Sequence, residues 1–190
     1  MLFDRASKID SLSRRYSYKL LANLVGFAVN LCTQAIIPRG LGPKAYGDFS
    51  FLSNFFSQVV SFFDLGTSAA FYTKLSQRQK DTGIISFYLA FAVIISFLVL
   101  LLVFIMGLTP FTNEIWPDQL MLFVYFAAIW AVLSWFIQIL NQMVDAFGLT
   151  VPGETAKISQ KLLGFILIVG LFFSDRLTLT NFFFITMYYS

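Results

Sequence analysis

The sequence predicts an all-α, polytopic transmembrane helix bundle. Hydrophobic residues make up 58% of the 190 residues and charged residues only 12%, whereas soluble domains carry about 45–50% and about 25% of these classes. The mean hydropathy is +0.76. The apolar residues suffice for about five membrane spans of ~20 residues each. Because so little charge cannot cover a solvated surface, we expect a bilayer rather than water to surround most of the chain.

Six apolar stretches divide the chain. We expect complete spans at 18–37, 46–70, 84–108, 120–143 and 158–173, and a partial sixth at 177–190. The sixth stretch has 14 residues, which at ~1.5 Å per residue reach about 21 Å, short of a ~30 Å hydrocarbon core. We therefore expect the chain to be the N-terminal part of a longer protein.

The segments between these stretches account for their boundaries. The basic segment 1–17 precedes the first span, and no small-residue cleavage site follows it, so we expect the span to be retained. The turn from Pro38 to Pro43 separates the first two spans, because proline and glycine favour reversals. A basic loop follows the second span, and a loop with Pro110 and Pro117 follows the third, most apolar span. The segment 145–161 is expected to form a loop with a short interfacial helix, and the fifth span recruits its residues from Ile158 onward.

The basic residues predict the orientation. If the N-terminus is cytoplasmic, ten Lys and Arg residues lie on the cytoplasmic side and three lie outside. Cytoplasmic loops carry an excess of Lys and Arg, so this arrangement is favoured. The cytoplasmic set is Arg5, Lys8, Arg14, Arg15, Lys19, Lys74, Arg78, Lys80, Lys157 and Lys161, and the outer set is Arg39, Lys44 and Arg176.

The composition excludes several kinds of chemistry. The chain has no histidine and one cysteine, Cys32, so Ser-His-Asp and Cys-His catalysis and the usual zinc sites are excluded. Glu114 and Asp118 are the closest acid pair, but they lie in a proline-bearing loop. We therefore expect no enzymatic activity, no cofactor and no metal. The net charge of +3 is attributed to cytoplasmic loops rather than to nucleic-acid binding.

Three of the spans carry polar side chains on one face. At ~100° per residue, the members of each stripe fall within about 80° of one another. The stripes are Lys19, Asn23, Asn30 and Gln34; Ser50, Asn54, Ser57, Ser61, Asp64 and Ser68; and Ser134, Gln138, Asn141 and Asp145. Two interpretations remain open: hydrogen bonds that join helices, or a shared aqueous or sugar-binding surface, because carboxamides both donate and accept.

Asp64 is the acid with the greatest expected depth in the membrane. If the second span continued to Ala70, Asp64 would lie about 9 Å inside it. An intramembrane carboxylate marks a functional site by default, so a proton or sodium site is one interpretation and a partner for Lys19 or Lys74 is another. The alternative is that Asp64-Leu65-Gly66 ends the helix near the cytoplasmic interface.

The segment AIIPRGLGPKAYGDF, residues 35–49, resembles the first inter-helix turn of the polysaccharide-export or O-antigen (Wzx-type) flippases. The family pattern is roughly R-x-L-G-P-x-x-Y-G-x-F. The matching residues are Arg39, Leu41, Gly42, Pro43, Tyr46, Gly47 and Phe49. The Asp64-Leu65-Gly66 segment and the polar end of the fourth span before Phe147-Gly148 are also similar, so the resemblance covers nearly the whole chain.

The resemblance implies the N-terminal lobe of a two-lobe exporter of the multidrug/oligosaccharidyl-lipid/polysaccharide superfamily. Such proteins flip undecaprenyl-diphosphate-linked oligosaccharides across the bacterial cytoplasmic membrane by alternating access, with an ion gradient as energy source. The expected partners are this substrate, membrane lipids and a C-terminal lobe. The first span departs from many relatives in offering only Lys19 as a cation for the diphosphate.

On this basis the stripes and the resemblance together predict the roles of individual residues. The expected cavity residues are Asn23, Asn30, Gln34, Asn54 and Ser57. Asp64 is the expected ion-coupling or gating site. The expected structural turn consists of Arg39, Gly42, Pro43, Tyr46 and Gly47. The alternatives are a cation-coupled small-molecule exporter of the same superfamily and a non-transporting, truncated membrane protein.

Overall fold

The computed structural model describes residues 12–79, 81–174 and 176–189, and every regular element in these ranges is an α-helix. The elements are α2 (Leu12–Leu41), α3 (Pro43–Asp64), α4 (Thr67–Gln77), α5 (Thr82–Gly107), α6 (Thr112–Ile115), α7 (Met121–Ala146), α8 (Thr150–Phe173) and α9 (Leu179–Tyr189). The expected all-α fold is confirmed. Residues 1–11 of the predicted basic segment lie outside the described residues.

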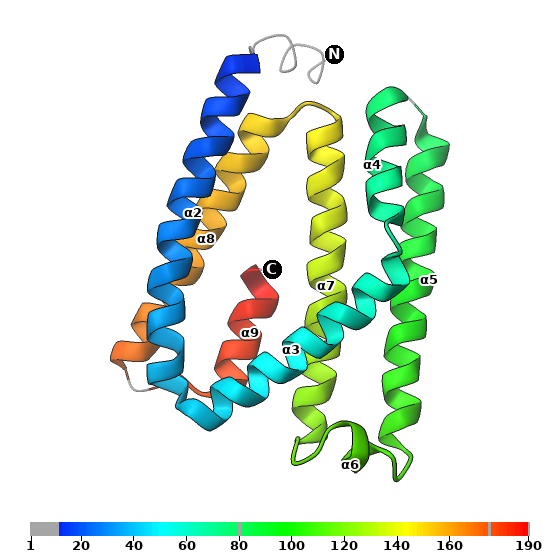
Figure 1. Ribbon diagram of the computed structural model, residues 1–190. Helices are drawn as coiled ribbons and strands as arrows, with labels where there is room; N and C mark the ends of the chain where they lie inside the picture. Colours follow the sequence, from blue (N-terminus) through cyan, green and yellow to red (C-terminus); the bar gives the residue numbers. More distant parts are fainter. Residues whose placement is uncertain (1–11, 80, 175, 190) are drawn as a thin grey trace.

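The helices run back and forth between two ends of a bundle, with α7 at its centre (Figure 1). Helix α2 packs against α8, and α7 packs against α3, α4, α5, α8 and α9. Helix α3 crosses the bundle obliquely, and α4 completes the path to the end where α5 begins (Figure 1). The N-terminal end of α2, the α4–α5 connection and the α7–α8 connection therefore lie at the same end.

Four helices of the described chain are long and apolar enough to cross a membrane. Their candidate spans are Tyr16–Leu41, Thr82–Gly107, Met121–Ala146 and Val151–Phe173. On α5, most of the exposed side chains are large and apolar, among them Phe87, Phe97 and Phe104. Such a surface suits lipid, because lipid tails solvate aliphatic and aromatic groups well. The structure thus supports a polytopic membrane protein.

The predicted second span, 46–70, is wrong as a continuous helix. Helix α3 ends at Asp64, and Leu65 and Gly66 have left-handed backbone conformations with φ of 45° and 79°. Helix α4 starts afresh at Thr67. Left-handed residues cannot continue a right-handed helix, so the return path consists of two helices joined at an angle rather than of one span.

The predicted fifth span, 158–173, is too short, and no separate interfacial helix precedes it. Helix α8 begins at Thr150, only a few residues after α7 ends at Ala146. Pro152 lies in the first turn of α8. A proline is tolerated there because the N–H groups of the first turn make no hydrogen bond within the helix. Lys157 and Lys161 therefore belong to the helix and not to a loop.

The turn between α2 and α3 is shorter than the predicted Pro38–Pro43 reversal. Pro38 lies inside α2, and the helix continues to Leu41. Gly42 then adopts φ 80° and ψ 162°, and Pro43 occupies the first turn of α3. The Gly42 N–H donates to the Pro38 carbonyl at 3.0 Å, and the Tyr46 N–H donates to the Gly42 carbonyl at 3.1 Å. One glycine therefore makes the reversal.

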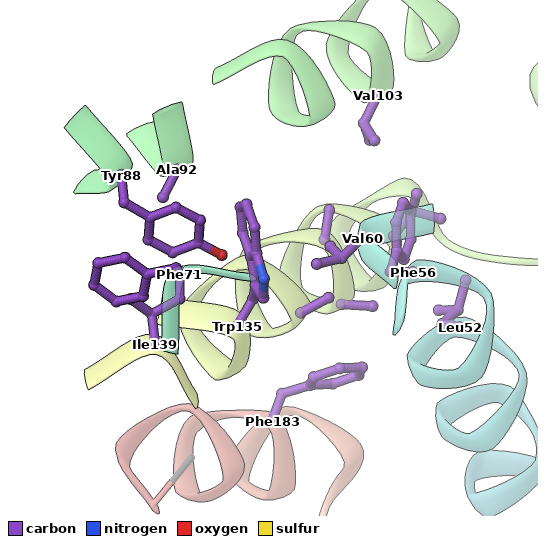
Figure 2. Packing of buried hydrophobic residues seen from close by; sticks show 14 of the residues in the cluster. Leu52, Phe56, Val60, Phe71, Tyr88, Ala92, Val103, Trp135, Ile139 and Phe183 are labelled. Atoms are coloured by element: carbon purple, nitrogen blue, oxygen red, sulfur yellow. The ribbon is translucent and has the colours of Figure 1, made fainter. Parts of the chain in front are cut away.

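The buried side chains gather around α7 and are mostly aromatic or branched. Phe56, Trp135, Ile139 and Phe183 are less than 5% exposed (Figure 2). Phe71 on α4 stacks on Tyr88 of α5 with ring centroids 4.1 Å apart. Because lipid tails are as apolar as these side chains, close packing rather than exclusion from water holds such helices together.

Candidate functional site

A small polar pocket lies between α3 and α7, and we name it the α3–α7 pocket. Its volume is about 170 Å³, and it is lined by Ser57, Val60, Ser61, Asp64, Ala131, Ser134, Trp135 and Gln138. The polar residues recur at helical spacing on each helix, so each helix presents them on one face. Two of the three predicted stripes, those of α3 and α7, therefore meet in one pocket.

Two buried hydrogen-bonding atoms of the residues that line this pocket have no partner within the described chain. Trp135 is only 4% exposed, and its Nε1 lacks an acceptor. The Ser134 Oγ is likewise buried without a partner. An unsatisfied buried donor costs about 1–3 kcal/mol, and both atoms expose less than 1 Å², so neither atom opens onto the pocket in this conformation.

The Asp64 carboxylate, at the end of the pocket, joins α3, α4 and α5. Its Oδ1 accepts from the Thr67 hydroxyl at 2.9 Å and from the Ser68 N–H at 3.1 Å. The Ser68 hydroxyl donates to Oδ2 at 2.7 Å, and the Tyr88 hydroxyl donates to Oδ1 at 3.3 Å. These contacts satisfy free N–H and O–H groups at the start of α4, as a capping side chain does.

A second pocket, which we name the Lys161 pocket, lies between α2, α7, α8 and α9. Its volume is about 190 Å³, and its lining includes Val29, Asn30, Thr33, Trp130, Lys161, Gly164, Phe165, Ile168, Ile185 and Thr186. Any side chain at Gly26 would place its Cβ 2.7 Å from the Lys161 Nζ. The missing side chain of Gly26 therefore makes room for the lysine.

Lys161 lies near the middle of the candidate span Val151–Phe173. It is exposed, and no acidic group of the described residues forms an ion pair with it. A lysine at this depth is costly to insert, and its function is the first hypothesis to consider. Within the described chain, the Lys161 pocket thus holds a cation without a counterion.

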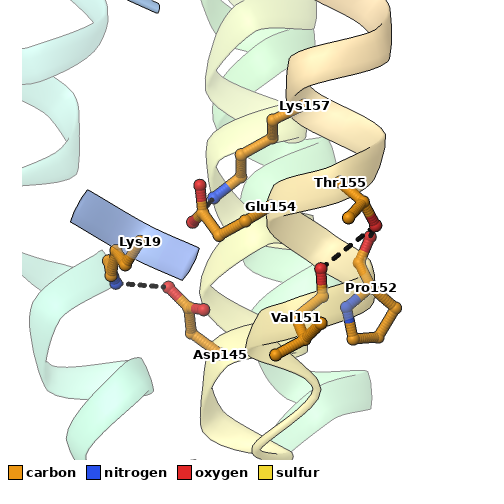
Figure 3. A network of polar contacts seen from close by, with 7 residues as sticks. All are labelled: Lys19, Asp145, Val151, Pro152, Glu154, Thr155 and Lys157. Atoms are coloured by element: carbon orange, nitrogen blue, oxygen red, sulfur yellow. Dashed lines mark hydrogen bonds and ion pairs between the residues drawn. The ribbon is translucent and has the colours of Figure 1, made fainter. Parts of the chain in front are cut away.

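Two ion pairs lie at the end of the bundle where α7 joins α8 (Figure 3). Lys19 of α2 pairs with Asp145 of α7 at 3.3 Å, so the first and third polar stripes touch there. Glu154 pairs with Lys157 on α8 at 3.0 Å, and the Glu154 side chain is buried. The first of these pairs connects the α2–α8 helices with α7.

The structure places two of the five predicted cavity residues in these pockets, and the two lie in different pockets. Asn30 lines the Lys161 pocket and Ser57 lines the α3–α7 pocket. Asn23, Gln34 and Asn54 are exposed and line neither of these two pockets.

Only some of the predicted turn residues shape the reversal between α2 and α3. Gly42, Pro43 and Tyr46 shape the reversal, as described above. Arg39 is exposed, and Gly47 faces open space on the side where a Cβ would lie. Nothing in the structure explains why position 47 is a glycine.

Lys161, Trp130 and Trp135 are the pocket residues that the sequence-based prediction missed. Lys161 stands near the start of the predicted fifth span, 158–173, and counts there as a cytoplasmic cation rather than as a residue within the membrane. A proline in the first helical turn is compatible with a helix, and this signal could have extended the fifth span back to Thr150. The tryptophans gave no signal, because an aromatic residue in an apolar helix usually belongs to the core.

No family model, curated protein or solved structure matches this chain.

Proposed function

We propose that this chain forms one lobe of a transporter that flips lipid-linked oligosaccharides across the bacterial cytoplasmic membrane. The observation that carries the proposal is the unpaired Lys161 at mid-span depth, which shares a pocket with Asn30 of the α2 stripe. A substrate with a diphosphate, a sugar chain and a lipid tail needs a cation, hydrogen-bonding groups and an apolar path. The resemblance of residues 35–49 to the flippase turn supports the same function.

Each part of the substrate has a candidate contact. Lys161 would attract the diphosphate, because an ammonium group binds phosphate as a point charge. The polar side chains Asn23, Asn30, Gln34, Asn54 and Ser57 would contact sugar hydroxyls. The apolar exposed faces of α5 and α8, with side chains such as Phe97 and Ile166, would leave the lipid tail in the bilayer.

Alternating access requires contacts that close one end of the path and can open again. The Lys19–Asp145 pair is suited to this, because its partners are partly exposed, at 51% and 22% of their side chains, and such pairs are weak. Asp64 would serve as the gating or ion-coupling residue, since it connects three helices. A second lobe would supply the facing half of the path.

A complementation experiment tests this function. The gene that encodes this chain, with any sequence in frame with it, is expressed in a bacterium whose own oligosaccharide-lipid flippase has been deleted. We expect surface polysaccharide to return. Absence of polysaccharide despite normal protein in the membrane would contradict the proposal.

An aromatic groove between α4 and α5 favours a second candidate, a cation-coupled exporter of small molecules. It has a volume of about 570 Å³ and includes Phe71, Phe87, Tyr88 and Phe91 among its lining residues. Aromatic faces attract apolar cations. Increased resistance to hydrophobic cationic drugs, without any change in polysaccharide, would favour this candidate over the flippase.

A further inference from the structure

The α3–α7 pocket offers hydrogen bonds that the protein itself does not use. The Trp135 Nε1 and the Ser134 Oγ are buried without partners. Ser57, Ser61 and Gln138 lie on the exposed side of the same pocket, and no hydrogen bond of their side chains occurs within the described chain. The accessible polar groups of the pocket are therefore hydroxyl and amide groups, which both donate and accept.

The charge of the pocket selects against an anion. Asp64 is its single charged side chain, and no lysine or arginine lines it. A phosphate or a carboxylate would be repelled there, because like charges at short range destabilise each other. The Asp64 oxygens already accept hydrogen bonds from Thr67, Ser68 and Tyr88. The remaining capacity thus suits a neutral ligand with several hydroxyl groups.

The two pockets differ in a way that matches the two polar parts of the proposed substrate. The Lys161 pocket carries an unpaired cation, whereas the α3–α7 pocket is acidic and its accessible polar groups are hydroxyl and amide groups. A diphosphate is attracted to the first pocket and repelled by the second. A neutral sugar has no such preference for the cation and gains hydrogen bonds in the second pocket.

We propose that the α3–α7 pocket binds one neutral sugar residue, with the Ser61 hydroxyl directed to a sugar oxygen and Gln138 bridging two hydroxyls. The volume of about 170 Å³ accommodates about one sugar ring or several waters, since a water occupies ≈ 30 Å³ of liquid. This inference rests on the proposed function, because it places the sugar portion of the lipid-linked substrate.

Protection of an introduced cysteine from disulfide formation with a thiol reagent tests this site. The full chain, with Cys32→Ala and Ser57→Cys, is placed in lipid nanodiscs and treated with a small methanethiosulfonate reagent. The probes are neutral methyl glycosides of common hexoses and N-acetylhexosamines, and inorganic diphosphate serves as the anionic comparison. We expect at least one glycoside to slow the reaction saturably and diphosphate to leave it unchanged. A Ser76→Cys chain carries its cysteine at an exposed position of α4. It shows whether a glycoside slows the reagent itself rather than its access to the pocket.

A second variant identifies the pocket itself. Gln138→Leu should weaken the protection about tenfold, which corresponds to about 1.4 kcal/mol. Gln58→Leu makes the same change at an exposed position of α3 outside the pocket and should leave protection unchanged. Equal protection in both variants, or no protection by any glycoside, would overturn the sugar site.

The failure of this inference and that of the proposed function have different signatures. Restored polysaccharide export, with no glycoside protection and with normal export in the Gln138→Leu variant, would overturn the sugar site alone. Protection by glycosides in a chain that restores no export would support the sugar site and contradict the flippase function.

Discussion

Asp64 combines a charge with a set of hydrogen bonds, and the two can be separated by substitution. Its carboxylate accepts from the Thr67 and Tyr88 hydroxyls and from both the N–H and the hydroxyl of Ser68. Ser68 is buried, so loss of the acceptor leaves buried donors unsatisfied. We expect Asp64→Ala to lower the free energy of unfolding by about 1–3 kcal/mol.

The isosteric substitution Asp64→Asn keeps one side-chain acceptor oxygen and should cost clearly less than Asp64→Ala. Thermal unfolding of the purified variants in detergent measures the difference. Equal midpoints for the two variants would show that the hydrogen bonds at the α3–α4 break do not stabilise the protein.

Export by the Asp64→Asn variant tests the ion-coupling role. Coupling to a proton or a cation needs the negative charge, so the asparagine variant should fold and reach the membrane but lose export. Surface polysaccharide in the complementation strain, normalised to membrane protein level, is the measurement. Normal export would leave Asp64 as a helix-capping and gating residue only.

Lys161 should be required for export but not for folding. No acidic partner depends on it among the described residues, so Lys161→Gln removes a charge without leaving another one unpaired. We expect Lys161→Gln to reduce export at least tenfold, as the loss of about 1.4 kcal/mol of substrate attraction would do. Lys161→Arg should retain part of the activity, because the charge is kept.

The matched control for this substitution is Lys44→Gln, since Lys44 is also exposed and lies at the start of α3. Its export should equal that of the unmodified chain. An equal decrease in both variants would indicate a general effect of net charge rather than a role for the Lys161 pocket.

The α2–α3 connection depends on a single backbone conformation. Gly42 has φ 80° and ψ 162°, in a region that only glycine adopts readily, and a side chain there costs of order 1–3 kcal/mol. We expect Gly42→Ala to destabilise the protein by this amount although open space surrounds the position. Gly47→Ala, also in open space but without a positive φ, should not destabilise the protein in the same thermal unfolding experiment, because alanine favours a helix more than glycine does.

The helices were predicted best where a long apolar stretch needed no tertiary information. The third and fourth spans, predicted at 84–108 and 120–143, correspond to α5 (Thr82–Gly107) and α7 (Met121–Ala146). The second span was wrong because Leu65 adopts a left-handed conformation that leucine rarely takes. The contacts of Asp64 with Ser68 and Tyr88 accompany this break, and composition alone does not reveal them.

The candidate site was predicted less completely than the fold. Helical spacing placed Ser57 and Asp64 on the same face of α3, and both residues line the α3–α7 pocket. It could not show that Gly26 of α2 lies against Lys161 of α8, because the two residues are far apart in sequence and meet only through helix packing. Periodicity predicts faces, whereas a pocket requires knowledge of which faces meet.

At the scale of the whole molecule, the positions of the cations connect fold and orientation. When the four cations inside the candidate spans are left out (Lys19, Arg39, Lys157 and Lys161), the predicted cytoplasmic side keeps seven cations against two outside, so the bias survives the correction. The connections α4–α5 and α7–α8 lie at the same end as the start of α2 (Figure 1). That end should therefore be cytoplasmic.

Cysteine accessibility tests this topology in intact cells. In a Cys32→Ala chain, Asp118→Cys lies in the connection before α7 and Arg78→Cys lies in the connection between α4 and α5. We expect a membrane-impermeant maleimide to label Asp118→Cys in intact cells and Arg78→Cys only after permeabilisation. Both positions are exposed, so a difference in labelling reports the side of the membrane rather than burial. The opposite pattern would invert the orientation, and labelling of both in intact cells would contradict the passage of α5 across the membrane, because α5 separates the two positions.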